Sequence, residues 1–203
     1  MNLPTSRTVE IPRLLHVGTC CLRDVGDLLA QHSFDLTKVL VGSGAGPSRL
    51  LAEHVCSGLG RSETPVVTRH ELDGRLEQAA TLAALIIEEG VTTAIGVGGG
   101  RAIDVVKLAA ARTGIDFVSV PTTIAHDGVS SPVASLTGRD GERASHAARM
   151  PSGIVVDVTA VASAPERTVR AGVGDLVSNL TACLDWRAAD ARGHDHYDAF
   201  AAM

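Results

Sequence analysis

Three glycines and an arginine stand where a phosphate could bind. Gly98, Gly99, Gly100 and Arg101 directly follow a short apolar strand predicted over residues 94–97. Glycines let the backbone approach a ligand closely, because no Cβ stands in the way. The helical pattern that follows would present the free N–H groups of its first turn, and a helix dipole, to an anion. The segment therefore predicts a phosphate site.

A second group of polar side chains follows the next predicted strand, residues 117–120. This loop holds Thr122, Thr123, His126, Asp127, Ser130 and Ser131. Strand, turn, helix and strand form one βαβ unit, in which both loops lie at the same edge of the sheet. We therefore expect a nucleotide site with a substrate pocket beside it. Two plainer alternatives stay open: a glycine turn that serves packing alone, and an Asx-type turn at His126 and Asp127.

A third candidate, Asp175, lies near the start of a helix predicted over residues 171–191. A carboxylate there is stabilised by the helix dipole and needs no further role. The helix has two faces, however. We expect an apolar face towards the core and a polar face that carries the candidate ligand: Val173, Leu176, Leu180 and Cys183 on the first, and Asp175, Ser178 and Asn179 on the second.

Strand and helix patterns alternate along most of the chain, which predicts a parallel α/β sheet. We expect strands at residues 7–18, 38–41, 66–68, 94–97, 117–120 and 153–157, with helices at 22–31, at 72–90 and after Gly100. In the last of these helices, Lys107 is expected to face solvent. A β-hairpin around residues 138–141 should lie off the main sheet. Pro165 begins a helical stretch, and we place a domain boundary near Thr159.

Composition excludes several classes of partner. The 203 residues are 45% hydrophobic but only 2% aromatic, so the core must consist of small aliphatic side chains. A net charge of −5 gives no general attraction to nucleic acid or to anionic membranes. No apolar run approaches the roughly 20 residues that span a bilayer, and the first residues lack the apolar core of a signal peptide. Four cysteines without metal-site spacing indicate free thiols in a reducing compartment, so we expect a cytoplasmic protein.

The strings GGGRAID, SVPTTIAHDGVSSP and AGVGDLVSNLTACLDWRA occur in that order. Together they resemble the iron-containing alcohol dehydrogenase and dehydroquinate synthase superfamily, and within it the sn-glycerol-1-phosphate dehydrogenases. The resemblance implies a Rossmann-like NAD(P)-binding α/β domain over residues 1–158. Residues 159–203 would then begin an all-helical metal-binding domain that in the family continues well past this point.

The resemblance also implies roles for particular residues. Gly99, Gly100 and Arg101 would cradle the pyrophosphate beside Gly98, Asp104 would support the turn, Thr122, Thr123 and Ser131 would contact the nucleotide, Asp127 the substrate, and Asp175 a divalent metal. Two histidines from later helices complete the metal site in the family. His194 and His196 are the only late histidines in this chain, and their polar surroundings and spacing predict solvated residues instead.

The function implied is a metal-dependent NAD(P)H oxidoreductase that interconverts dihydroxyacetone phosphate and sn-glycerol 1-phosphate, with zinc as the first candidate metal and nickel or iron as alternatives. The metal would act as a Lewis acid on the ketone of this small phosphorylated substrate. Gly42 and Ser43 end the second strand without the carboxylate that commonly holds a ribose 2′-hydroxyl, so NADPH should be accepted at least as well as NADH. The alternatives are an iron-type alcohol dehydrogenase, a dehydroquinate-synthase-like cyclase, and a nucleotide-binding remnant without catalysis. An unfinished helical domain would favour association of the chain with itself, as a homo-oligomer, or instability.

Overall fold

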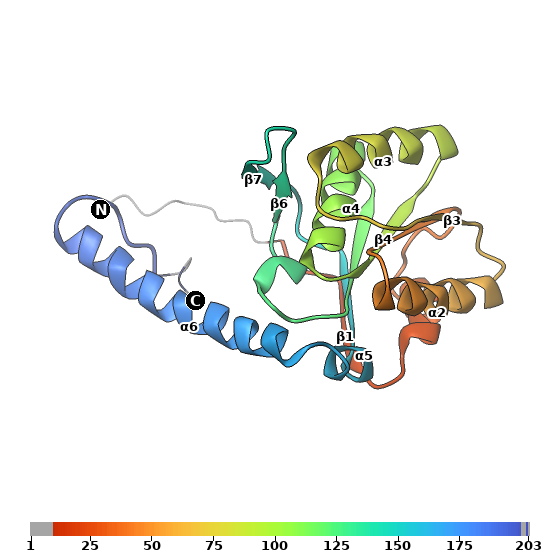
Figure 1. Ribbon diagram of the computed structural model, residues 1–203, viewed down its shortest axis with the longest axis horizontal. Helices are drawn as coiled ribbons and strands as arrows, with labels where there is room; N and C mark the ends of the chain where they lie inside the picture. The colour runs from red at the N-terminus through yellow and green to blue at the C-terminus, as the bar shows by residue number, and fades with distance from the viewer. Residues whose placement is uncertain (1–9, 200–201, 203) are drawn as a thin grey trace.

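The computed structural model describes residues 10–199 and residue 202. The predicted entry strand begins at residue 7, so its first three residues lie outside the described part. Among the described residues, no helix has the length and apolar character needed to cross a membrane. The chain forms an α/β domain from which one long helix extends (Figure 1).

Six parallel strands form the main sheet, in the order β1-β8-β5-β4-β2-β3. The strands are β1 (Leu14–Gly18), β2 (Val39–Ser43), β3 (Val66–Arg69), β4 (Thr93–Gly98), β5 (Asp116–Pro121) and β8 (Gly153–Asp157). The central strands β2 and β4 are buried along their whole length, which explains why their sequences, VLVGS and TAIGVG, contain no charged residue. The predicted parallel sheet is confirmed.

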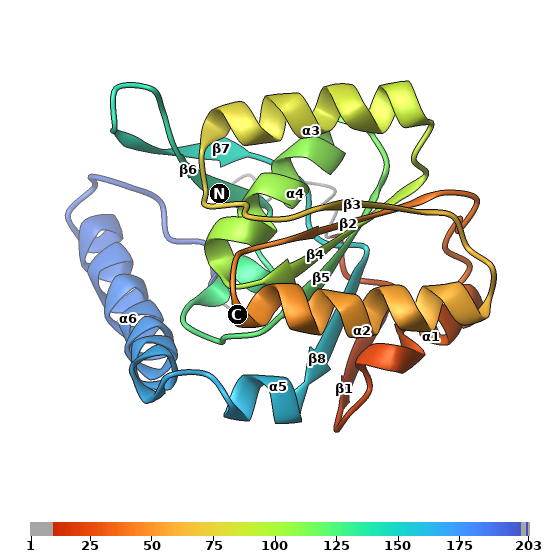
Figure 2. The same ribbon diagram turned by 45° about the vertical axis from the view of Figure 1, so that its right-hand side comes forward.

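Helices cover both faces of this sheet, as Figure 2 shows. The helices of the domain are α1 (Val25–Gln31), α2 (Pro47–Arg61), α3 (Leu76–Glu89), α4 (Gly100–Thr113) and α5 (Val158–Ala162), with short 3₁₀ turns η1 (Leu22–Asp24) and η2 (Asp127–Val129). One apolar cluster joins α3 and α4 to the sheet, and a second joins α1, α2 and α5 to its other face. The loops that follow the neighbouring strands β2 and β4 thus lead to helices on opposite faces, α2 and α4.

The predicted hairpin is present and lies apart from the main sheet. It consists of β6 (Val133–Thr137) and β7 (Arg143–Ala147), which pair antiparallel as a two-stranded sheet. Two side chains of β6, Ala134 and Leu136, are fully buried in the cluster that contains α3 and α4. The hairpin therefore packs beside α4.

The prediction for Lys107 was wrong. Its side chain is fully buried on α4, where its ammonium group is surrounded by polar partners. The hairpin and η2 cover the face of α4 that the helical pattern alone leaves open to solvent, and contacts of both with α4 account for the burial.

The end of the chain differs from the sequence prediction in two respects. The expected pair of helices is a single helix, α6 (Glu166–Ala191), with Pro165 as its N-cap residue. Its apolar side chains do not face a core: Val173, Leu176 and Leu180 are exposed, Leu176 by 70%. The polar side of α6 turns towards the α/β domain instead, because Asp175 and Gly172 lie against the loop that follows β5.

Candidate nucleotide and active site

A cleft of about 480 Å³ opens at the carboxyl end of the sheet, between the loops that follow β2 and β4. Open α/β sheets bind ligands where neighbouring strands send their chains to opposite faces. Here Gly44, Ala45 and Ser48 line the cleft from the β2–α2 side, and Gly99 and Gly100 line it from the β4–α4 side. The cleft therefore lies at the topological switch point of the sheet.

The glycine turn shapes the floor of this cleft. Gly98 has a φ of +152°, a conformation that side chains rarely adopt, and its carbonyl accepts a hydrogen bond from the Thr122 N–H at 2.9 Å. Gly99 then serves as the N-cap of α4 without a capping side chain. The first N–H groups of α4 thus remain available to an anion in the cleft.

The loop after β5 forms the facing wall. Thr123 and His126 line the cleft, and the His126 ring lies so close to Gly100 that a Cβ on that residue would be 2.2 Å from Nε2. His126 Nδ1 accepts a hydrogen bond from the Gly128 N–H at 3.0 Å. A neutral ring that accepts at Nδ1 carries its proton on Nε2, so this nitrogen is a donor beside the glycine turn.

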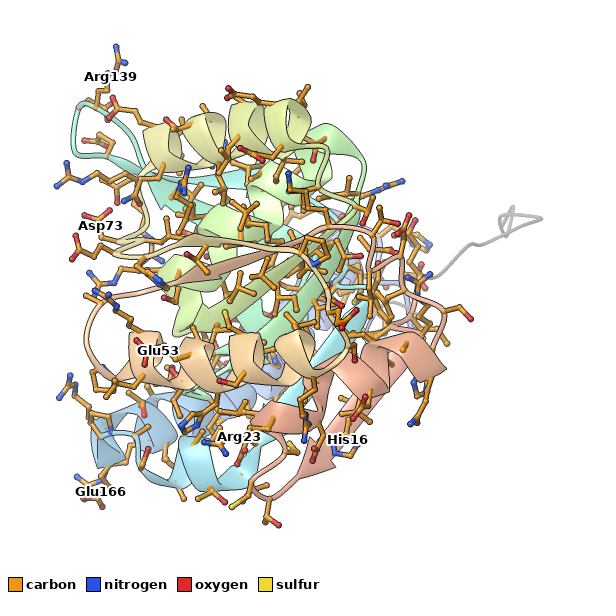
Figure 3. The ribbon with its side chains drawn as sticks, turned by 90° about the vertical axis from the view of Figure 1, so that its right-hand side faces the viewer. His16, Arg23, Glu53, Asp73, Arg139 and Glu166 are labelled. Carbon is orange, nitrogen blue, oxygen red and sulfur yellow. The ribbon has the colours of Figure 1, made fainter. Side chains whose placement is uncertain are left out.

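Charged side chains surround the mouth of the cleft. Arg101 and Arg143 contribute positive charge, and Glu71 and Asp73 contribute negative charge from the loop after β3. Asp73 is paired with Arg75 at 3.1 Å, and Figure 3 shows it between the hairpin tip and α2, on one side of the molecule. The cleft thus combines two arginines and a helix N-terminus with Glu71, a carboxylate that pairs with no basic side chain among residues 10–199.

Asp127 and Asp175 meet at the far side of the same loop. The Asp127 N–H donates to Asp175 Oδ2 at 2.9 Å, which joins η2 to α6. Gly172, one turn earlier on α6, makes this approach close: a Cβ there would be 1.9 Å from the Ile124 carbonyl oxygen. Residues 48 positions apart, both selected from the sequence, are therefore neighbours in space.

The predicted nucleotide residues divide into two groups. Gly99, Gly100, Arg101 and Thr123 line the cleft. The other predicted contacts lie outside its lining: Gly98 forms the turn beneath it, Thr122 is buried, and the Ser131 hydroxyl donates to the Val133 carbonyl at 3.4 Å.

Asp104 differs from its expected place beside the glycine turn. It is buried, and its two carboxylate oxygens accept hydrogen bonds from Lys107 and from the Ser135 N–H. Its carboxylate therefore holds the β6 strand against α4, one helical turn below the cleft.

The described part of the chain fits a nucleotide better than a metal. A phosphate has a glycine turn, free N–H groups and a cleft, whereas no group of three or more histidine, cysteine, aspartate or glutamate side chains within residues 10–199 is arranged to hold an ion. Asp175 supplies one carboxylate only. His194 and His196 are both exposed, and His196 lies 3.6 Å from Asp190, as expected for solvated residues.

Several residues of the site were missed from the sequence. Ser48, the pair Glu71 and Asp73, and Arg143 come from three separate segments, and no pattern along the chain links them. Ser48 had one usable signal, because it occupies the first turn of the helix that follows a glycine-rich loop. The other three reach the cleft only through the tertiary fold.

Comparison with known proteins identifies related dehydrogenases. The family model described as iron-containing alcohol dehydrogenase matches residues 16–165. The glycerol-1-phosphate dehydrogenases [NAD(P)+] of Aeropyrum pernix and Pyrococcus furiosus are 36% and 35% identical to the chain, over 96% of its length and 55% of their own. The chain therefore spans about half the length of the curated relatives it matches.

Solved structures show the same fold at low identity. Glycerol dehydrogenase from Schizosaccharomyces pombe superposes with a TM-score of 0.73 at 20% identity, covering 87% of this chain and 45% of that one. NADH-dependent butanol dehydrogenase A from Thermotoga maritima also gives 0.73, at 18% identity, covering 87% and 50%. With the family model matched over most of the chain, this protein belongs to the iron-containing alcohol dehydrogenase family.

Proposed function

We propose that the chain is the NAD(P)-binding part of a metal-dependent oxidoreductase that interconverts dihydroxyacetone phosphate and sn-glycerol 1-phosphate, in the synthesis of glycerophosphate for polar lipids. The observation that carries this proposal is the cleft at the switch point, whose wall residue His126 directly precedes Asp127, the residue that donates to Asp175. The substrate assignment is supported by the names of the relatives, which are glycerol-1-phosphate dehydrogenases.

In this proposal the nucleotide supplies the hydride, and the chain positions it. Gly99, Gly100 and the first turn of α4 hold the pyrophosphate, with Arg101 at its side. Thr123 and the His126 Nε2 hydrogen face the same space from the opposite wall. The Thr122 hydroxyl lies 3.4 Å from that of Ser48, which lines the cleft, and the Ser131 hydroxyl donates to the Val133 carbonyl.

Asp127 and Asp175 belong to the substrate and metal end of the site. Asp127 is exposed at η2, which leaves its carboxylate free to meet a hydroxyl or carbonyl group of the substrate. Asp175 offers one carboxylate to a divalent ion, for which zinc remains the first candidate, with nickel or iron as alternatives. Because the described residues hold no further ligands, we assign no step to the metal in this chain.

We place the start of the helical domain at Thr159, so that residues 1–158 form the nucleotide domain; this boundary falls inside α5, whose Ala160 still packs against the sheet. The apolar side chains exposed along α6 suit a helix that packs within a larger helical unit. The four cysteines are all free thiols, which agrees with a cytoplasmic location.

The proposal is tested by titrating NADPH and NADH into the chain and into a Gly100→Ala variant. Alanine at this position would push the His126 ring out and break its hydrogen bond to Gly128. We expect NADPH affinity to fall by about tenfold or more, equivalent to one charge-assisted hydrogen bond. Gly60→Ala on α2, where a Cβ meets nothing within 4 Å, is the matched control and should bind normally. Equal NADPH affinity of all three proteins would show that the nucleotide does not bind in this cleft.

A nucleotide-binding chain without catalysis is the second candidate, and the single carboxylate at the metal position favours it. An assay of NADPH oxidation with dihydroxyacetone phosphate and zinc separates the two. Turnover by this chain would support the oxidoreductase, and binding without turnover would support the second candidate. A cyclase would regenerate its nucleotide, so a lasting fall in NADPH absorbance excludes that chemistry.

A further inference from the structure

One of the two lysines in this chain is fully buried. Lys38 lies at the amino end of the sheet and pairs with Glu89 near the surface, whereas the Lys107 side chain has no exposed area. Taking an ammonium group out of water is costly unless hydrogen bonds replace the lost hydration. A buried lysine in a chain that otherwise uses arginine for positive charge therefore calls for a specific role.

The ammonium of Lys107 has three hydrogen-bond partners. It donates to Asp104 Oδ1 at 3.1 Å, to the Gly128 carbonyl at 2.6 Å and to the Val133 carbonyl at 2.7 Å. A lysine ammonium carries three donors, so this set uses all of them. The planar fork of an arginine could not direct its donors to three acceptors that surround one atom.

These partners come from both walls of the cleft. Lys107 and Asp104 belong to α4, whose first turn lines the cleft with Gly100. Gly128 belongs to η2, and Val133 begins β6, so the two carbonyls mark the ends of the segment that follows His126 and Asp127. Asp104 adds a second link through the Ser135 N–H at 3.0 Å.

We infer that Lys107 is a positioning residue. Its hydrogen bonds hold the wall formed by residues 126–133 against α4, so that ligand binding in the cleft also stabilises the ordered conformation of this wall. A ligand on the glycine turn would also touch Thr123 and His126, which lie on the same loop. The fastened wall in turn presents the Asp127 N–H to Asp175. Lys107 thus links the nucleotide helix, the loop and α6 without touching the ligand itself.

Electrostatics agree with a group held charged by its partners. Burial lowers the pKa of Lys107, and the Asp104 and Asp127 carboxylates oppose that shift. The inference rests on the proposed function only in taking NADPH as the ligand of the cleft.

The chain has only two lysines, so amine acetylation followed by mass spectrometry gives the reaction rate of each one in the unaltered protein. The effect of NADPH on the rate at Lys107 measures the coupling. We expect Lys107 to react far more slowly than Lys38, through transient opening of the wall. NADPH at about 100 times its Kd should slow Lys107 by up to about 100-fold if it binds only the closed form. Lys38 should not change. Lys107 reacting as fast as Lys38, or at an unchanged rate with NADPH bound, would overturn the inference.

Variants separate positioning from simple stability. Lys107→Met keeps the length of the side chain and removes its donors, and Asp104→Asn/Lys107→Met also removes the unpaired carboxylate. In both, amide hydrogen exchange over residues 126–133 should rise by about tenfold or more, while β4 and β5 keep their protection. Lys38→Met, the same change at the other lysine, should leave this segment as it is.

The ligand response of the variants completes the test. NADPH should still bind to the double variant but should protect residues 126–133 less than in the unaltered chain. Unchanged exchange in the double variant without ligand would refute the fastening. Failure of the unaltered chain to bind NADPH would refute the proposed function instead, and the comparison without ligand would still decide the role of Lys107.

Discussion

Replacing Gly172 with alanine should detach α6 from the loop that it contacts. The new Cβ would lie 1.9 Å from the Ile124 carbonyl oxygen, and ordinary contact requires at least 3.4 Å. The helix or the loop would have to retreat by about 1.5 Å. The hydrogen bond from the Asp127 N–H to Asp175 Oδ2, now 2.9 Å long, cannot span that retreat.

The size of the effect follows from the bond that is lost. A hydrogen bond to a charged acceptor contributes about 1.5 to 3 kcal/mol when well shielded. Because Asp127 is exposed, we expect about 1 to 2 kcal/mol at this site, which corresponds to a roughly five- to thirtyfold increase in exchange of the Asp127 amide. If Asp175 holds the metal as proposed, a shift of this size should lower kcat by about 100-fold.

Gly174 is the matched control on the same helix. A Cβ at Gly174 meets nothing within 4 Å. Both substitutions should raise the helix content seen by circular dichroism, since alanine is favoured over glycine in a helix by about 1 kcal/mol. Only Gly172→Ala should release the Asp127 amide in hydrogen exchange measured by NMR. If the two variants exchange alike at Asp127, α6 does not dock on this loop.

Three further predictions concern pH, thiols and nucleotide preference. Burial lowers the pKa of Lys107 below its ordinary value of 10.5. Between the two values the unfolded chain binds more protons than the folded chain, so the free energy of unfolding should rise with pH in this window. Urea melts at several pH values should show this rise in the unaltered protein and not in Lys107→Met. With a thiol reagent, Cys20 should react first because it is exposed, whereas burial raises the pKa of Cys21 and Cys56 and should slow both; equal rates for all three would contradict the packing of η1 and α2. NADPH should bind at least as well as NADH. Glu71→Gln removes a carboxylate that repels the 2′-phosphate and should increase the preference for NADPH. If titration shows that both proteins prefer NADH, the 2′-phosphate does not bind in this cleft.

Local patterns were sufficient for most of the fold. Strand β8 has the predicted bounds, α3 ends one residue before Gly90 as predicted, and the hairpin lies off the main sheet. These elements depend on short-range rules, namely apolar periodicity and the residues that cap helices or form turns. The glycine turn and the Thr123 wall were found for the same reason, since each follows a strand whose end is visible in the sequence.

Faces of helices were harder to predict, because a face is buried only by what packs against it. Lys107 looked solvent-exposed along α4 until η2 and the hairpin covered it. The apolar stripe of α6 looked like a core face, yet the polar side of this helix makes the contact with the domain. Periodicity identifies two faces but does not say which neighbour each one meets.

The sequence by itself determined the class of the fold and the position of the glycine turn, and with the family resemblance it singled out Asp127 and Asp175 as candidate ligands. Only the tertiary structure decided that β2 and β4 are neighbours, which opens the cleft, and that Glu71 and Arg143 stand at its mouth. It also decided that Asp104 and Lys107 make hydrogen bonds to the segment that follows β5 and to β6. The physical reason is that strand order and the packing of loops depend on contacts between residues far apart in the chain, which no local pattern records.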